Sequence, residues 1–113
     1  VRTIAATAAD AFEVRDEVAG SGPHIARVHW LLADVPYELD LAGSHLRLKT
    51  LAGDFIVAWR ALGSTATVAR ADHASRRGWW SPYYNQAAPA LSLAIEVPWA
   101  ERAEIITTLQ PAA

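Results

Sequence analysis

One stretch constrains the fold of this chain most strongly: residues 78–93, GWWSPYYNQAAPALSL. Trp79, Trp80, Tyr83 and Tyr84 fall within six residues, and each can remove about 150–250 Å² of surface from water. Consecutive residues of a β-strand point to opposite faces, so a regular strand over 79–84 separates Trp79 and Tyr83 from Trp80 and Tyr84. We expect one face to build the core and the other to contact a second layer, another domain or a ligand.

Short alternations of apolar and polar residues recur along the whole chain. Turn-forming residues interrupt them about every 8–12 residues, a spacing typical of antiparallel sandwiches and barrels. We expect strands over residues 12–18, 24–32, 37–41, 45–49, 55–62, 65–70, 79–84, 92–97 and 104–109, with residues 1–9 as a weak edge strand or a lead-in. The one helical candidate, residues 99–106, is short. The sequence therefore predicts an all-β fold, an antiparallel β-sandwich of about nine strands forming a single domain over residues 1–113.

The composition narrows the classes of partner. Hydrophobic residues make up 52% of the chain and charged residues 19%, so it can bury a core. The net charge of −2 gives no basic surface for nucleic acid or for an anionic membrane. No apolar run approaches the roughly 20 residues of a membrane-spanning helix. Cysteine is absent, which excludes disulfides and thiolate metal sites, and methionine is absent too, which indicates a processed or excised piece of a longer protein.

The histidines do not form a metal-site pattern. They are His24, His29, His45 and His73. A zinc site needs three or four converging ligands, usually with a short-spaced pair, whereas the five-residue spacing of His24 and His29 puts them on opposite faces of a regular strand. We interpret the four as surface or hydrogen-bonded strand histidines, with proton transfer by one of them as the alternative. The sequence predicts no metal and no cofactor.

Neighbouring acidic and basic residues indicate ion pairs rather than catalysis. Asp16 and Glu17 follow Arg15, and Asp72 lies close to Arg70 in the sequence. A carboxylate pair can carry out general acid–base chemistry, but adjacent strand residues point apart. The sequence also lacks the phosphate-binding, serine-hydrolase and zinc-protease motifs. We therefore expect solvated faces or cross-strand ion pairs here, and we assign no catalytic residue.

The arginine pair directly before the tryptophans is the best functional candidate. Guanidinium groups match carboxylate and sulfate geometry, and a tryptophan face can stack on a sugar ring. The candidate contact residues, for a carbohydrate or for another domain, are Arg76, Arg77, Trp79, Trp80, Tyr83 and Tyr84. The alternative is that the aromatic side chains pack in the core or between domains and that the arginines are ordinary loop charges. Gly78 lies where a loop enters a strand, so we expect it to tolerate substitution poorly.

This part of the chain resembles the C-terminal part of the heparinase II/III-like polysaccharide lyases. The shared features are Gly-Trp-Trp-Ser-Pro-Tyr-Tyr-Asn at 78–85, Ala-Pro-Ala-Leu at 88–91 and a closing strand at 103–109. Asn85 stands where the family usually has glycine, a mild difference because Asn tolerates a positive φ better than most residues. Upstream, Asp16, a Gly-Ser-Gly-Pro-His turn and Val28-His29-Trp30 follow the order of the family, so the resemblance covers most of the chain.

The resemblance implies a non-catalytic sandwich domain that packs on an N-terminal α/α toroid of the same parent chain. The implied reaction is β-elimination on an anionic, uronic-acid-containing polysaccharide such as heparin, heparan sulfate or alginate. In it, a base removes the proton beside the carboxyl carbon and an acid protonates the leaving oxygen. No residue here matches the catalytic motif of the family, so no catalytic position is carried over.

Two questions stay open at the level of sequence. The composition, rich in alanine and with arginine far in excess of lysine, indicates a bacterial source, and the parent is expected to be periplasmic or secreted, with a cytoplasmic location as the alternative. The alternative function is a stand-alone carbohydrate-binding or interaction module. A purely structural sandwich without sugar affinity is the third interpretation.

Overall fold

The computed structural model describes residues 1–84 and 86–112, and every helix-or-strand element in that part of the chain is a β-strand. The strands are β1 (Arg2–Ala8), β2 (Ala11–Ala19), β3 (His24–Leu32), β4 (Tyr37–Asp40), β5 (His45–Thr50), β6 (Gly53–Arg60), β7 (Thr65–Arg70), β8 (Trp79–Trp80), β9 (Ala88–Pro89), β10 (Leu91–Trp99) and β11 (Arg102–Pro111). All strand pairings are antiparallel. The predicted all-β sandwich is confirmed, with eleven strands in place of about nine.

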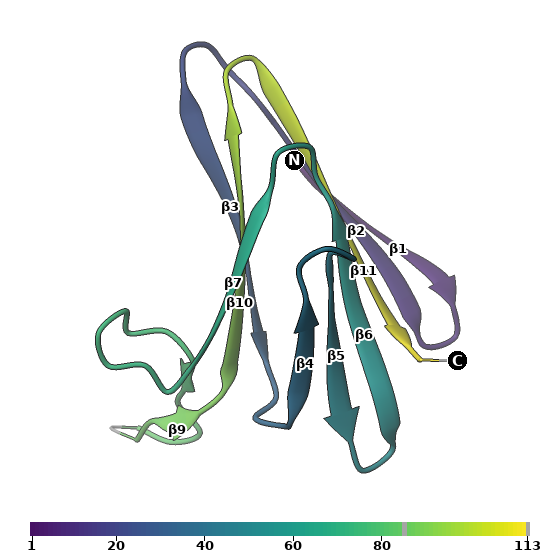
Figure 1. Cartoon of the computed structure of the whole chain (residues 1–113), viewed down its shortest axis with the longest axis vertical. Coiled ribbons are helices and arrows are strands. Elements are labelled where there is room, and N and C mark those ends of the chain that lie inside the picture. Colours follow the sequence, from purple (N-terminus) through teal and green to yellow (C-terminus); the bar gives the residue numbers. More distant parts are fainter. Residues whose placement is uncertain (85, 113) are drawn as a thin grey trace.

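The strands form two facing layers (Figure 1). The larger sheet has six strands in the order β1-β2-β11-β6-β5-β4, and the smaller sheet has three in the order β3-β10-β7. The short pair β8-β9 lies at the end of the smaller sheet where β10 begins (Figure 1). No helix that could cross a membrane occurs within residues 1–84 and 86–112.

The core lies between the two layers and is centred on β10. Alternate residues of this strand, Leu91, Leu93 and Ile95, are fully buried and pack in one cluster with Val57 and Trp59 of β6. Ser92 and Ala94, which point to the opposite face of β10, are buried as well, so this part of the strand is covered on both faces. Because the alternation of apolar residues is clean over this segment, the sequence predicted the central strand correctly.

The expected regular strand over residues 79–84 is wrong. β8 contains Trp79 and Trp80 alone, which pair with Pro89 and Ala88. The chain then turns, because Pro82 has no backbone N–H to continue a ladder and because Ser81 Oγ donates a hydrogen bond to the backbone oxygen of Tyr83 at 2.7 Å. The aromatic residues therefore do not supply two alternating faces, and the buried tryptophan of the core is Trp59 instead.

Three further expectations have clear outcomes. Residues 2–8 form a true edge strand, β1, paired with β2 along its length. Residues 99–106 are not helical, because β10 and β11 are joined by a tight turn at 100–101. Asp16 forms the expected cross-strand ion pair, with its carboxylate 2.7 Å from Arg2 Nε. The expectation for Asn85 lies outside the described residues.

Candidate functional site

The candidate contact residues lie on the long connection between β7 and β10, residues 71–90, which we call the aromatic loop. Its first part folds back on itself because Ala71, Arg76 and Gly78 have positive φ values of 45°, 60° and 80°. The reversal brings Asp72 opposite Arg77, where the Asp72 N–H donates to the Arg77 carbonyl at 2.9 Å. Residues 72–77 thus form a closed turn between β7 and β8.

The carboxylate of Asp72 fixes the inside of this turn. It accepts hydrogen bonds from Ser75 Oγ at 2.5 Å and from the backbone N–H groups of Ser75 and Ala74 at 3.3 Å. This is the local bonding by which Asp stabilises turns. The hydrogen bonds from Ser75 lower the pKa of Asp72. The carboxylate of Asp72 therefore stabilises the loop rather than pairing with Arg70.

Arg77 anchors the aromatic loop to the smaller sheet. Its Nε donates to Ser92 Oγ at 2.9 Å and its Nη2 to the Ser92 backbone oxygen at 2.9 Å, so it is bound to β10. Toward β7, Nη1 donates to Thr67 Oγ1 at 2.9 Å and Nη2 to the Thr67 backbone oxygen at 3.1 Å. Burial is the main cause that lowers the pKa of Arg77. The guanidinium group of Arg77 is therefore directed at the smaller sheet of the same chain.

His29 of β3 joins the same cluster through Ser92. Its Nε2 lies within hydrogen-bonding distance of Ser92 Oγ. The Ser92 hydroxyl already accepts a hydrogen bond from Arg77 Nε. It therefore donates its own hydrogen bond to His29 Nε2 when that nitrogen carries no proton. Burial, followed by the positive charges of Arg77 and Arg27, lowers the pKa of His29 and so favours that neutral form. His29 is the hydrogen-bonded strand histidine expected from the sequence.

A serine bonded to a histidine is also the arrangement of an activated nucleophile, but this pair has a structural role. Ser92 is fully buried, with no exposed surface, and its oxygen is held by Arg77. Within the described residues, no three His, Asp or Glu side chains gather closely enough to hold a metal ion. Sequence reasoning missed this cluster, although Ser92 inside an apolar strand was a signal for a buried polar contact.

Gly78 lets the loop come back onto the edge of the sheet. It is buried, and a Cβ atom at this position would lie 2.6 Å from the Ala71 backbone nitrogen and 2.8 Å from the Ala69 oxygen. Its carbonyl accepts hydrogen bonds from the N–H groups of Ala71 at 3.0 Å and Ala90 at 2.8 Å. The positive φ and the close backbone both require glycine, which gives the expected intolerance its physical basis.

The aromatic side chains divide into one that packs inward and three that face solvent. Trp79 is half-buried, its Nε1 donates to the Asp72 backbone oxygen at 3.3 Å, and its ring centroid lies 4.9 Å from that of His73. Trp80, Tyr83 and Tyr84 are 49%, 71% and 92% exposed. Arg76 is also exposed. Arg76, Trp80, Tyr83 and Tyr84 form what we call the exposed aromatic surface.

Comparison with known proteins identifies the fold. No protein-family model and no curated protein matches the sequence. Two solved structures do match, both of heparinase III, the BT4657 gene product. The one with methylated lysines has a TM-score of 0.76 and 16% identity, and the other has a TM-score of 0.74 and 15% identity. Each match covers 91% of this chain and 16% of the heparinase III chain. The chain therefore shares the fold of one segment of a much longer enzyme.

Proposed function

We propose that this chain is a non-catalytic β-sandwich domain of a larger polysaccharide lyase related to heparinase III. The observation that carries the proposal is the match of 91% of this chain to 16% of heparinase III with a TM-score of 0.76. The order of the sequence motifs, from Asp16 through the Gly-Trp-Trp-Ser-Pro stretch, supports the same relationship independently of the fold.

In this proposal the exposed aromatic surface contacts another domain of the parent chain, an α/α toroid that carries the catalytic groups. Trp and Tyr side chains combine large apolar area with a polar group and are enriched at interfaces. The contacts of Arg77 and the close approach at Gly78 hold this surface on the sheet. A surface that is already ordered loses little conformational entropy when it binds.

The parent would cleave an anionic, uronic-acid-containing polysaccharide by β-elimination, outside the cytoplasm. This domain would supply packing and support rather than the base or acid of the reaction. The serine and histidine side chains that it brings together, Ser92 and His29, are engaged in holding Arg77 and the loop.

The proposal is tested by assaying this chain and the longer protein encoded by its full reading frame side by side. Both are incubated with heparin, heparan sulfate and alginate, and the absorbance of the unsaturated uronic-acid product is followed. We expect turnover by the longer protein and none by residues 1–113 alone. Turnover by the isolated chain, or a longer protein that cleaves none of these polymers, would overturn the proposal.

The exposure of Trp80, Tyr83 and Tyr84 also favours a second function, that of a stand-alone carbohydrate-binding module. A free module would bind glycans through these side chains without any neighbouring catalytic domain. Glycan binding by the isolated chain that is lost in Trp80→Ala, together with an inactive longer protein, would establish this function in place of the first.

A further inference from the structure

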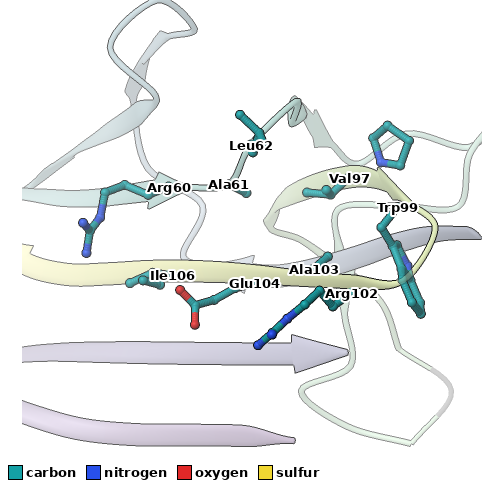
Figure 2. A pocket seen from close by; sticks show the side chains of 10 residues that line it. Arg60, Ala61, Leu62, Val97, Trp99, Arg102, Ala103, Glu104 and Ile106 are labelled. Carbon is teal, nitrogen blue, oxygen red and sulfur yellow. The ribbon is translucent and has the colours of Figure 1, made fainter. Parts of the chain in front are cut away.

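A groove of about 590 Å³ opens at the end of the sandwich opposite the aromatic loop. Figure 2 shows its walls, to which β6, β10 and β11 all contribute. Its main side chains are Arg60, Leu62, Trp99, Arg102, Glu104 and Ile106. The volume lies in the range of ligand sites, about 300–1,000 Å³.

Unequal strand lengths create the groove. β6 ends at Arg60, which pairs with Ile106, whereas β11 extends four residues beyond this pair, to Arg102. Residues 102–105 of β11 therefore pair with β2 on one side and, within the described chain, with no strand on the other. The backbone along this open edge can offer hydrogen-bond donors and acceptors to a ligand. The open edge of β11 therefore presents backbone polar groups along the groove.

Two arginines face the groove without an ion-pair partner in the described part of the chain, Arg60 and Arg102. Arg60 shares a face of the sheet with Ile106, and residues 102 and 104 lie on that face as well because strand residues alternate. Figure 2 shows Arg60 extending from β6 toward β11, and Glu104 and Arg102 extending from β11 toward β2.

The local charge favours an anion. Glu104 is the acidic residue among those that line the groove, and its carboxylate lies 3.8 Å from Arg15 Nη1, which offsets part of its charge. The positive charges of Arg60 and Arg102 therefore exceed the negative charge of Glu104 in the groove. Guanidinium groups bind carboxylates and sulfates with two parallel hydrogen bonds, so they favour a ligand that carries such a group.

Trp99 gives the groove a fixed aromatic wall. Its ring stacks on His24 with centroids 4.7 Å apart and an interplanar angle of 29°. The far edge of the indole lies close above Gly20, where a Cβ atom would be 3.2 Å from Trp99 Cη2. These contacts hold the half-buried indole in one orientation, so little side-chain entropy is lost when a ligand packs against it. Leu62, which is 96% exposed, adds apolar surface near the groove.

We propose that this groove binds an acidic sugar unit of a polysaccharide. The carboxylate or sulfate pairs with the arginines that line the groove, Arg60 and Arg102, and the sugar ring packs against Trp99 and Leu62. The choice of a polysaccharide rests on the proposed function. The groove adds to that function a polysaccharide contact on the sandwich itself, distant from the aromatic loop that the sequence indicated.

The test uses the folded chain and short oligosaccharides of defined charge. Binding of a heparin tetrasaccharide, an alginate tetrasaccharide and a neutral cello-oligosaccharide is measured by calorimetry. The indole N–H signals of the five tryptophans are followed by NMR. We expect the acidic sugars to bind and to shift the Trp99 signal, and the neutral sugar not to bind. The ratio of affinities for the two acidic sugars distinguishes sulfate from carboxylate recognition.

Variants locate the site. The double variant Arg60→Gln/Arg102→Gln should weaken binding of the acidic sugars by about tenfold or more, because two charged contacts are removed. Leu62→Ser should weaken it less. The matched control is Lys49→Gln, which removes an exposed cation of β5 outside the groove and should bind like the parent chain. Thermal unfolding of each variant verifies that it is folded.

Three outcomes would overturn the groove proposal: no binding of either acidic sugar, equal binding of the neutral sugar, or loss of binding in Lys49→Gln but not in the double variant. The fate of the proposed function is separate, because it depends on cleavage by the longer protein. If the longer protein cleaves the polysaccharide but the sandwich domain binds no sugar, only the groove proposal is wrong. If the groove binds sugar but the longer protein has no lyase activity, only the proposed lyase function is wrong.

Discussion

Arg77 Nε donates a hydrogen bond to Ser92 Oγ at 2.9 Å, and this contact joins the aromatic loop to the central strand β10. Ser92 is fully buried, so its hydroxyl has no access to water as a replacement partner. The same guanidinium also reaches Thr67 on β7. One side chain therefore ties the loop to two neighbouring strands, and the exposed aromatic surface depends on it for a fixed position.

Replacing Arg77 by Leu should lower the free energy of unfolding by about 2 kcal/mol, because hydrogen bonds to a charged group contribute roughly 1.5–3 kcal/mol. Urea denaturation followed by tryptophan fluorescence measures the change. Arg76→Leu is the matched control, since it removes the same side chain from an exposed neighbouring position. It should change stability by no more than about 0.5 kcal/mol. Equal losses in the two variants would mean that the contacts of Arg77 do not stabilise the loop.

Gly78→Ala should destabilise the chain more than Gly63→Ala. Both glycines have similar positive φ values, 80° and 71°, so each substitution introduces strain of about 1–2 kcal/mol. At Gly63 a Cβ atom would meet nothing within 4 Å, whereas at Gly78 it would lie 2.6 Å from the Ala71 nitrogen. We expect an additional loss of about 1–3 kcal/mol at Gly78, the usual range for overpacking.

Thermal unfolding of the two glycine variants in the same buffer separates these contributions. The Gly63 variant measures the strain of an alanine at positive φ, and the difference between the variants measures the overlap with the backbone of residues 69–71. Identical melting temperatures would show that the loop moves aside without cost.

His29 should make the fold sensitive to mild acid. Its pKa is lowered from 6.5 in the folded chain, first by burial and then by Arg77 and Arg27. The unfolded chain therefore takes up the proton more readily. The stability that His29 contributes is complete above pH 6.5 and is lost as the pH falls through 6.5 toward the lowered pKa. Protonated Nε2 can no longer accept from Ser92 Oγ, and the new charge repels Arg77.

Urea denaturation between about pH 8 and pH 5, the range in which histidines titrate, tests this expectation. His29→Gln cannot titrate, so its stability should vary less over this range than that of the parent chain. Asp72, whose pKa is lowered from 3.8, acts in a more acidic range and does not interfere. Parallel curves for the two proteins would contradict a role for His29.

The sequence predicted those parts of the fold that depend on local alternation. Leu91, Leu93 and Ile95 alternate with smaller or polar residues, and the strand expected over residues 92–97 is present as β10, with these three side chains in the core. The prediction failed where tertiary contacts override the pattern. Trp79 and Trp80 are typical strand residues, but their short partner, Ala88–Pro89, and the turn at Pro82 end the strand after two residues.

The candidate sites were less predictable because their residues are distant in the sequence. His29 and Ser92 are 63 residues apart and meet only because β3 and β10 pair in one register. Arg60 and Arg102 come to one groove only because β6 stops opposite Ile106. Strand order and strand length decide both juxtapositions, and neither is encoded in a local pattern. The exposed position of Trp80, Tyr83 and Tyr84 likewise follows from the turn rather than from their hydrophobicity.

The tryptophans of the core and of the aromatic loop should differ in stability cost according to their burial. Trp59 is 4% exposed, so Trp59→Ala should cost about 3–5 kcal/mol, the usual range for a buried aromatic residue. Trp80 is 49% exposed, and Trp80→Ala should cost less than about 1 kcal/mol. Trp79→Ala should fall between them, because it removes the hydrogen bond to Asp72 and the contact with His73.

Chemical denaturation of the three alanine variants establishes this order in the isolated chain. The decisive comparison is then made in the longer parent protein. If the exposed aromatic surface packs against a second domain there, Trp80 becomes buried, and Trp80→Ala should cost more than it does in residues 1–113 alone. Trp59 is already buried within the sandwich, so the cost of Trp59→Ala should not change and serves as the control. An unchanged cost for Trp80→Ala would mean that the surface remains in solvent, which excludes it as the interdomain contact and leaves it free to bind a glycan.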